Sequence, residues 1–173
     1  MMHRTDSDNW QKALYDRYAR RLQGFFLRQL GHDAQAAADA THDTFLRAFE
    51  AGERLSDNGN EAAWLFTIAY NLLRNRYRHQ AYETDYLAQL DRQPMEEQQI
   101  ELRLDQQTLL AALGKVLDGL SPPLRLLFSL RHEEELTVPQ VAEILQIPEG
   151  TVKSRLHKTM TIIRKQLKEY EDQ

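Results

Sequence analysis

The chain has 173 residues, of which 42% are hydrophobic and 28% are charged, and its formal net charge is −4. This length fits one medium domain or two small ones, and no apolar run approaches the roughly 18 residues that a membrane span needs. The absence of cysteine excludes disulfides and thiolate metal sites, and the polar N-terminus lacks a secretory signal. We expect a cytoplasmic protein without membrane insertion. Taken for the whole chain, the acidic balance argues against a nucleic-acid partner, because the polyanion attracts Lys and Arg.

The first half of the chain shows the spacing of helices. Its apolar residues recur at intervals of three and four, which predicts an all-α fold. The second helix is expected over residues 34–51, and the third over 61–80, after a loop of Gly, Asn, Asp and Ser at 52–60. The first helix is expected to end near Gly31 and to bury one face, made of Leu14, Tyr18, Leu22, Phe25 and Phe26.

Residues 83–107 differ in composition from the rest of the chain. They hold seven acidic residues against two arginines, a net charge of −5, together with several glutamines and Pro94. We interpret this segment as a linker with some helix at its end. The expected division is a first domain at 1–82, an acidic linker at 83–106 and a second domain at 107–173. The remainder of the chain then carries +1, so the overall charge does not exclude DNA.

The second domain carries two signals for helix starts. Ser121 followed by Pro122 is one, and Thr137 with Gln140 three residues later resembles a capping box. The helix from Thr137 should end by residue 146, and a short turn leads into a last helix at 149–170. These are the dimensions of a helix-turn-helix. The alternative is an ordinary αα-hairpin with a basic, solvated end.

In a helix-turn-helix, the second helix enters the major groove of DNA. The first half of the last predicted helix has Glu149 as its single acid. Arginine and lysine at these positions can pair with guanine or with phosphate. The outward-facing residues that we expect to contact DNA are Lys153, Ser154, Arg155, His157 and Lys158.

The third predicted helix offers a second surface, because residues 62–81 contain no acid. At about 100° per residue, Leu65, Ile68, Ala69 and Leu72 form a core stripe. The opposite sector suits single-stranded nucleic acid, since rings stack on unpaired bases and guanidinium groups bind phosphates. Alternatively, its aromatic residues pack against a neighbouring helix while the arginines form a solvated rim. The sector consists of Phe66, Thr67, Tyr70, Asn71, Arg74, Tyr77 and Arg78.

Several motifs together resemble the sigma factors of bacterial RNA polymerase. The resemblance to region 2 of the family lies in residues 39–49 (DATHDTFLRAF) and 63–71 (AWLFTIAYN), together with Arg74 and Arg78. The resemblance to region 4 lies in residues 120–125 (LSPPLR), 141–145 (VAEIL) and 150–155 (GTVKSR). The size matches the extracytoplasmic-function (ECF) group, which keeps only these two regions. The resemblance implies two small helical domains, and a factor that directs promoter recognition and DNA melting for transcription initiation.

The resemblance also implies roles for individual residues. The loop at 52–60 and the start of the next helix would read the −10 element, Asn71 would hold the non-template strand, and Arg74 and Arg78 would contact its backbone. The last helix would read the −35 element, with Thr151 at a phosphate. Core RNA polymerase would be bound through its β′ clamp helices and β flap, and an anti-sigma factor is an expected partner. The residues implied to dock on the clamp helices are Asp39, Asp43, Phe45, Arg47 and Phe49.

The chain departs from the family pattern at two places. Ala38 stands where the family usually has Glu, and His42 where Gln is common. After Arg155 the family often continues with a basic run, whereas here the sequence is Lys158-Thr159-Met160.

Two other classes of function are weaker interpretations. Asp39, His42 and Asp43 share a helical face that could hold a metal, but no further histidine lies at a supporting spacing, and no phosphate loop or nucleophile elbow is present. We therefore expect no metal, no cofactor and no catalysis. The stronger alternative is a helix-turn-helix regulator that acts without core polymerase. The acid-free aromatic helix argues against it, since a reader of duplex DNA does not need such a helix.

Overall fold

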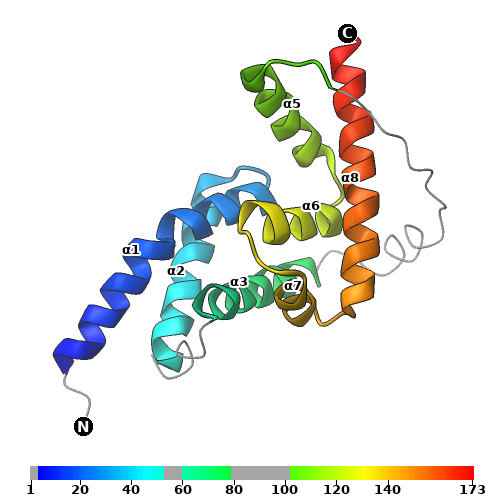
Figure 1. The fold of residues 1–173 in the computed structure, drawn as a ribbon. Helices are drawn as coiled ribbons and strands as arrows, with labels where there is room; N and C mark the ends of the chain where they lie inside the picture. The colour runs from blue at the N-terminus through cyan, green and yellow to red at the C-terminus, as the bar shows by residue number, and fades with distance from the viewer. Residues whose placement is uncertain (1–3, 53–59, 79–101) are drawn as a thin grey trace. The chain divides into compact units, whose positions relative to one another are not determined.

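The structure, a computed structural model, describes residues 4–52, 60–78 and 102–173. Every regular element in these ranges is helical, which confirms the all-α prediction. None of the described helices is long and apolar enough to span a membrane. The elements are α1 (Arg4–Gln29), α2 (Ala34–Ala51), α3 (Glu61–Tyr77), α5 (Gln106–Gly119), α6 (Pro122–Phe128), a π-helical turn η2 (Ser129–Glu133), α7 (Val138–Leu145) and α8 (Glu149–Glu171) (Figure 1).

The chain divides into two compact units. In the first, α2 packs along α1 and α3 packs against both of them (Figure 1). The turn after α1 contains Gly31 and His32 with φ values of 64° and 61°, and Asp33 caps α2 by accepting a 3.0 Å hydrogen bond from the Ala36 amide. The predicted buried face of α1 is confirmed, since all five of its residues are at most 6% exposed.

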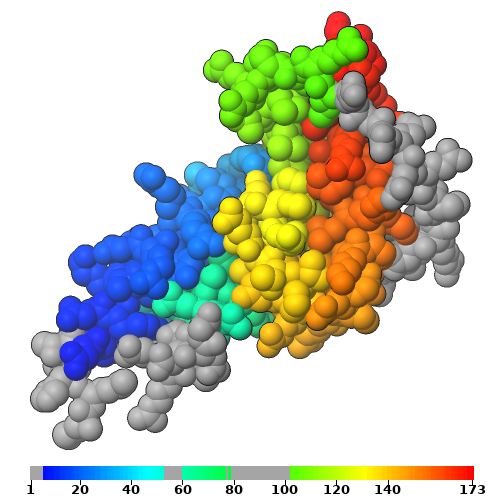
Figure 2. Space-filling model, in the orientation of Figure 1, coloured from blue at the N-terminus to red at the C-terminus, as the bar shows by residue number. Residues whose placement is uncertain are grey.

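The second unit is built around α5, α6 and α8. Its core joins Val116 and Leu117 of α5 and Leu124 and Phe128 of α6 to α8 residues such as Ile163. The packing of α5 (green) against the C-terminal part of α8 (red) can be followed in Figure 2. These apolar contacts hold the C-terminal half of α8 against α5 and α6.

The two predicted helix starts in this unit are stabilised by different hydrogen bonds. Pro122 opens α6 as expected, but the side chain of Ser121 caps no helix N–H. The turn is held instead by Arg125, whose Nη1 donates to the carbonyls of Asp118 and Leu120 at 3.2 and 3.1 Å. The capping box before α7 is confirmed. The Thr137 amide donates to Gln140 Oε1 at 2.8 Å, and the Gln140 amide donates to Thr137 Oγ1 at 3.3 Å.

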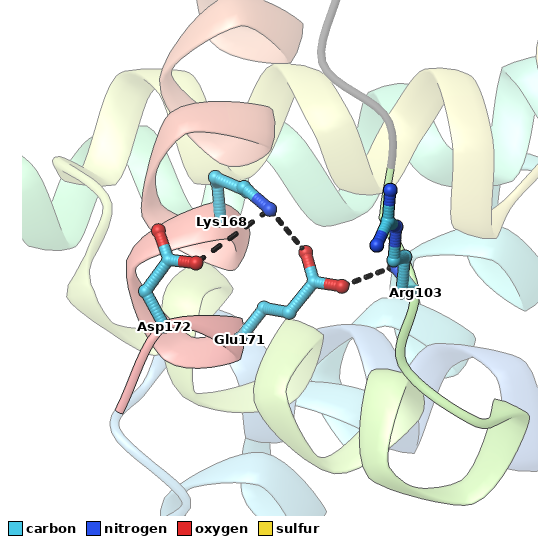
Figure 3. Close-up of polar contacts among 4 residues, drawn as sticks. All are labelled: Arg103, Lys168, Glu171 and Asp172. Carbon is cyan, nitrogen blue, oxygen red and sulfur yellow. Dashed lines mark hydrogen bonds and ion pairs between the residues drawn. The ribbon is translucent and has the colours of Figure 1, made fainter.

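A polar clasp joins the last turn of α8 to the chain just before α5 (Figure 3). Glu171 Oε1 accepts a 2.6 Å hydrogen bond from the Arg103 amide, while its other oxygen accepts from Lys168 Nζ at 2.8 Å. Lys168 also lies 3.6 Å from a carboxylate oxygen of Asp172. Both interactions of Glu171 favour its charged form, so the bond to Lys168 and then that to Arg103 hold the pKa of this carboxyl below its ordinary value.

This clasp predicts a pH-dependent protection of the Arg103 amide. Because the pKa of Glu171 is lowered in the folded protein, its contribution to stability is present above its ordinary pKa and is lost as pH falls through the folded value. We expect Glu171→Gln to lower the protection factor of the Arg103 amide at neutral pH, and this lower protection factor should change little further on acidification. Glu169→Gln, at an exposed position on the same turn, is the control. Equal exchange in wild type and Glu171→Gln would contradict the role of the clasp.

Candidate nucleic-acid interface

The side of α3 that we expect to bind a single strand is only partly exposed. Asn71 and Arg78 are exposed, whereas Tyr70 and Arg74 are half-buried. Thr67 is also half-buried, and its hydroxyl donates a 2.7 Å hydrogen bond to the Ala63 carbonyl. The side chain of Tyr77 lies outside the described residues. Two further exposed side chains on the last turns of α3, Asn75 and Arg76, extend this surface.

Phe66 does not belong to the exposed surface, and its predicted role in base stacking is wrong. Its side chain is 0% exposed. The ring of Phe25 meets it edge to face at 5.2 Å between centroids, and the guanidinium of Arg21 lies 5.7 Å from its centroid. The alternative that we left open, packing against a neighbouring helix, is therefore the observed one for this residue.

The core stripe of α3 is accordingly rotated from the predicted one. Leu65 and Ala69 are buried as expected, but Phe66 and Leu73 complete the stripe, while Ile68 and Leu72 are half-buried. A helical wheel gives the angular spacing of side chains and not the direction from which another helix approaches. Here α1 and its Phe25 ring lie on the Phe66 side.

The five residues of α2 that are implied to dock on polymerase differ in exposure, and Phe49 is half-buried. Asp39, Asp43 and Arg47 are exposed, and Asp39 Oδ1 accepts a 2.9 Å hydrogen bond from the side-chain Nε2 of Gln35. Phe45 is only 2% exposed, so its assignment as a direct contact is corrected. Its ring instead packs between those of Tyr15 and Phe49, with centroids 4.9 and 5.7 Å away.

Two apolar side chains beside these residues were missed from the sequence. Tyr15 of α1 is 53% exposed and Leu46 of α2 is 46% exposed. Leu46 lies between the buried Phe45 and the exposed Arg47, and Tyr15 follows the buried Leu14. A large apolar residue one position out of register with a buried stripe is the signal that would have found both.

Among the described residues, no other side chain joins the acids and histidine of α2 in a group that could hold a metal. Asp39, His42 and Asp43 are all exposed. Across the part of the chain that the structure describes, no group of three or more histidine, aspartate or glutamate side chains could hold an ion. The exposed acids of α2 therefore form a polar surface next to Leu46.

The turn between α7 and α8 has the form of a helix-turn-helix. Gln146 takes a φ of 54°, and the Ile147 amide donates to the Ala142 carbonyl at 3.1 Å. Val141, Ala142, Val152 and Leu156 are buried along the two helices. Because these residues are buried, the opposite side of the α8 N-terminal half faces outward.

That outward side holds the residues predicted to read duplex DNA. Lys153, Ser154 and His157 are exposed, and Thr151, Arg155 and Lys158 are half-buried. Ser154 Oγ donates a 3.2 Å hydrogen bond to the Thr151 carbonyl, which keeps that hydroxyl near the first turn of α8. Lys153 is exposed in the first two turns of α8, and a lysine at such a position has the length to contact a base edge or a phosphate.

Comparison with known proteins gives a consistent family. A family model for sigma-70 region 2 matches residues 14–82, and one for sigma-70 region 4 matches residues 110–162. The ECF RNA polymerase sigma factor SigL of Mycobacterium tuberculosis strain H37Rv is 34% identical over 164 residues, which cover 91% of this chain and 89% of SigL. SigW of Bacillus subtilis strain 168 is 28% identical over 170 residues, with 90% and 88% covered.

A solved structure shows the same fold. It is the sigma factor RpoE in complex with the anti-sigma factor NepR from Bartonella quintana, with a TM-score of 0.66, 23% identity, and coverage of 91% of this chain and 96% of that one. The two matched regions contain α3 and the helix-turn-helix, the elements that carry the two exposed surfaces described above. The chain therefore belongs to the extracytoplasmic-function group of the sigma-70 family, the factors that bind core RNA polymerase and direct it to promoters.

Proposed function

We propose that three separate surfaces divide the work of this sigma factor: α2 binds core polymerase, α3 holds the melted −10 strand and α8 reads the −35 element. The observation that carries this division is the distribution of exposed charge. The exposed side of α2 carries both acidic and basic side chains. In contrast, residues 62–81 contain no acidic residue, and the outward side of α8 is basic. Phosphate contacts favour the last two surfaces.

On α3, Asn71 and the arginines of the last turns are the groups that meet the strand. The carboxamide of Asn71 is exposed and can donate to and accept from the edge of an unpaired base. Arg76 and Arg78 are exposed beyond it and can bind phosphates. A surface that binds only the unpaired strand shifts the equilibrium between closed and open promoter toward the open state.

On α2, the proposed polymerase contact combines charge with apolar area. Asp39, Asp43 and Arg47 supply the charged groups, and Leu46 with Tyr15 supplies exposed apolar surface that a partner can cover. Phe45 supports this surface from below through its ring contacts with Tyr15 and Phe49. The β′ clamp helices are the proposed partner of this face.

On α8, we expect Lys153→Ala to weaken promoter binding by the holoenzyme and to flatten its salt dependence. Each lost phosphate contact lowers the slope of log K against log salt by about 1. Binding to duplex promoter DNA at several salt concentrations measures both effects. Lys165→Ala removes the same charge from an exposed position three turns further along α8 and serves as the control. If both variants change the slope equally, the assignment of Lys153 is wrong.

The remaining proposals concern the linker and the partners. We propose residues 83–106, most of which lie outside the described residues, as the acidic linker between the domains at 1–82 and 107–173. The RpoE structure contains an anti-sigma factor, and we propose that a factor of this kind restrains this chain too. The chain acts by binding, without catalysis of its own, in the cytoplasm where polymerase and promoters meet.

Transcription in vitro tests the proposed function as a whole. Core polymerase with the purified chain should initiate from members of a promoter library that core polymerase alone does not use, and the selected sequences define the −35 and −10 elements. The rival function, a regulator that works without polymerase, predicts tight duplex binding by the chain alone. Failure to associate with core enzyme, together with such binding, would refute the proposal.

A further inference from the structure

The first residue of α3 stands out electrostatically from the rest of the helix. Glu61 is the single acidic residue in the whole segment 61–81. It begins the helix directly after Asn60, whose side chain makes no capping hydrogen bond. An acid in the first turn stabilises a helix, because it interacts favourably with the positive end of the helix dipole. The same carboxylate repels any phosphate that approaches the start of α3.

A residue of α1 offsets this charge. The guanidinium Nη1 of Arg17 donates to Glu61 Oε2, and the two residues are 44 positions apart in the sequence. Beneath the pair lies Tyr18, which is 6% exposed. Burial, and then the charge of Glu61 and a hydrogen bond that the Tyr18 hydroxyl donates to Glu61, raise the pKa of Tyr18. Glu61 therefore lies between α1 and α3, in contact with Arg17 and Tyr18.

Folding stability alone gives little reason for this ion pair. The Arg17 side chain is 58% exposed and that of Glu61 is 22% exposed. Exposed pairs of this kind contribute about 0–1 kcal/mol to stability. The apolar and aromatic contacts of α1 with α3, such as that of Phe25 with Phe66, already hold the two helices together. The pair also places the positive charge of Arg17 directly beside the negative charge at the start of α3.

We propose that Arg17 belongs to the strand-binding surface of the first unit, where it neutralises Glu61 so that α3 can begin with an acid without repelling the phosphates of a bound single strand. This inference rests on the proposed role of α3. The strand-binding surface then includes a residue of α1 as well as residues of α3. Arg17 holds the Glu61 side chain in place and screens its charge from the strand.

The test compares charge variants in the assembled holoenzyme. The probe is a fluorescent single-stranded DNA that carries the non-template −10 strand of a promoter on which the wild type is active. Arg17→Ala should weaken its binding by about three- to tenfold at low salt, since the charge of Glu61 is then no longer offset and repels the phosphates of the strand. Glu61→Gln should bind at least as tightly as wild type. The double variant Arg17→Ala/Glu61→Gln should recover wild-type affinity to within about twofold, and Arg17→Lys should retain it.

The matched control is Arg20→Ala, which removes an equal charge from an exposed position of α1. Its loss of affinity should be smaller and should not be recovered by Glu61→Gln. The inference is overturned if Arg17→Ala binds like wild type, or if its defect persists in the double variant. If the wild-type holoenzyme itself does not bind the strand, the proposed function of α3 fails instead. The thermal unfolding midpoint of Arg17→Ala should lie near that of the wild type. This result would exclude a folding defect as the cause of weaker binding.

Discussion

Replacing Phe66 by Ala should lower the free energy of unfolding of the first unit by about 3–5 kcal/mol. The ring is 0% exposed and makes an edge-to-face contact with Phe25, so its removal leaves a cavity between α1 and α3. Neighbouring side chains are themselves close-packed and can fill only part of this cavity. A loss of this size is a large fraction of the stability of a small domain.

Tryptophan fluorescence measures this loss without interference from the second unit. The two tryptophans of the chain, Trp10 and Trp64, both lie in the first unit, so denaturant titration followed by their emission reports on that unit alone. Leu72→Ala is the matched control. Leu72 was predicted to be core but is half-buried, so its replacement should lower the free energy of unfolding by less than Phe66→Ala does. If Phe66→Ala kept wild-type stability but lost strand binding, base stacking by Phe66 would be restored as the correct interpretation.

Asn71→Ala is expected to lower the equilibrium constant for open-complex formation by about tenfold, the loss of roughly one good amide contact to a base edge. Binding to core polymerase and folding stability should not change, because Asn71 is exposed on α3 and not part of the packed core. The variant should therefore lose promoter opening while it keeps its affinity for core polymerase. This difference is expected because a surface that binds only the melted strand acts on the opening step, after the factor has bound polymerase.

Two measurements on one holoenzyme preparation test this expectation. Fluorescence of a base analogue in the −10 region follows opening, and titration of labelled factor with core enzyme gives the affinity for polymerase. Gln23→Ala, which removes a similar carboxamide from an exposed position of α1, is the control. Equal losses of core binding and of promoter opening in Asn71→Ala would remove Asn71 from the strand-binding surface.

The parts of the fold that could be predicted are those decided by near neighbours in the chain. The bounds of α2 and the capping box of Thr137 and Gln140 follow from backbone geometry and from hydrogen bonds that span three or four residues. The exposed start of α8 is likewise readable from the spacing of its apolar residues. The π-helical turn η2 after α6 was not predicted, since its sequence continues the helical pattern without a break.

The kinds of side chain in the candidate site were predicted from the sequence, but only some of the individual residues were predicted correctly. Asn71, Arg78 and Lys153 are exposed as expected, because polar side chains opposite a core stripe remain in water. Phe45 and Phe66 are not exposed, because each faces an aromatic side chain of α1. Aromatic residues at the edge of a stripe lie inside or outside according to which helix packs beside them, and periodicity contains no information about that helix.

The sequence by itself determined the class of fold, the family and the concentration of positive charge on two helices, since these depend on composition, spacing and motifs. The tertiary structure alone decided which aromatic residues are core, and it alone placed Arg17 against Glu61 across 44 residues of chain. Contacts of that kind depend on how α1 lies against α3, and that arrangement is selected by packing of the whole unit rather than by any local pattern.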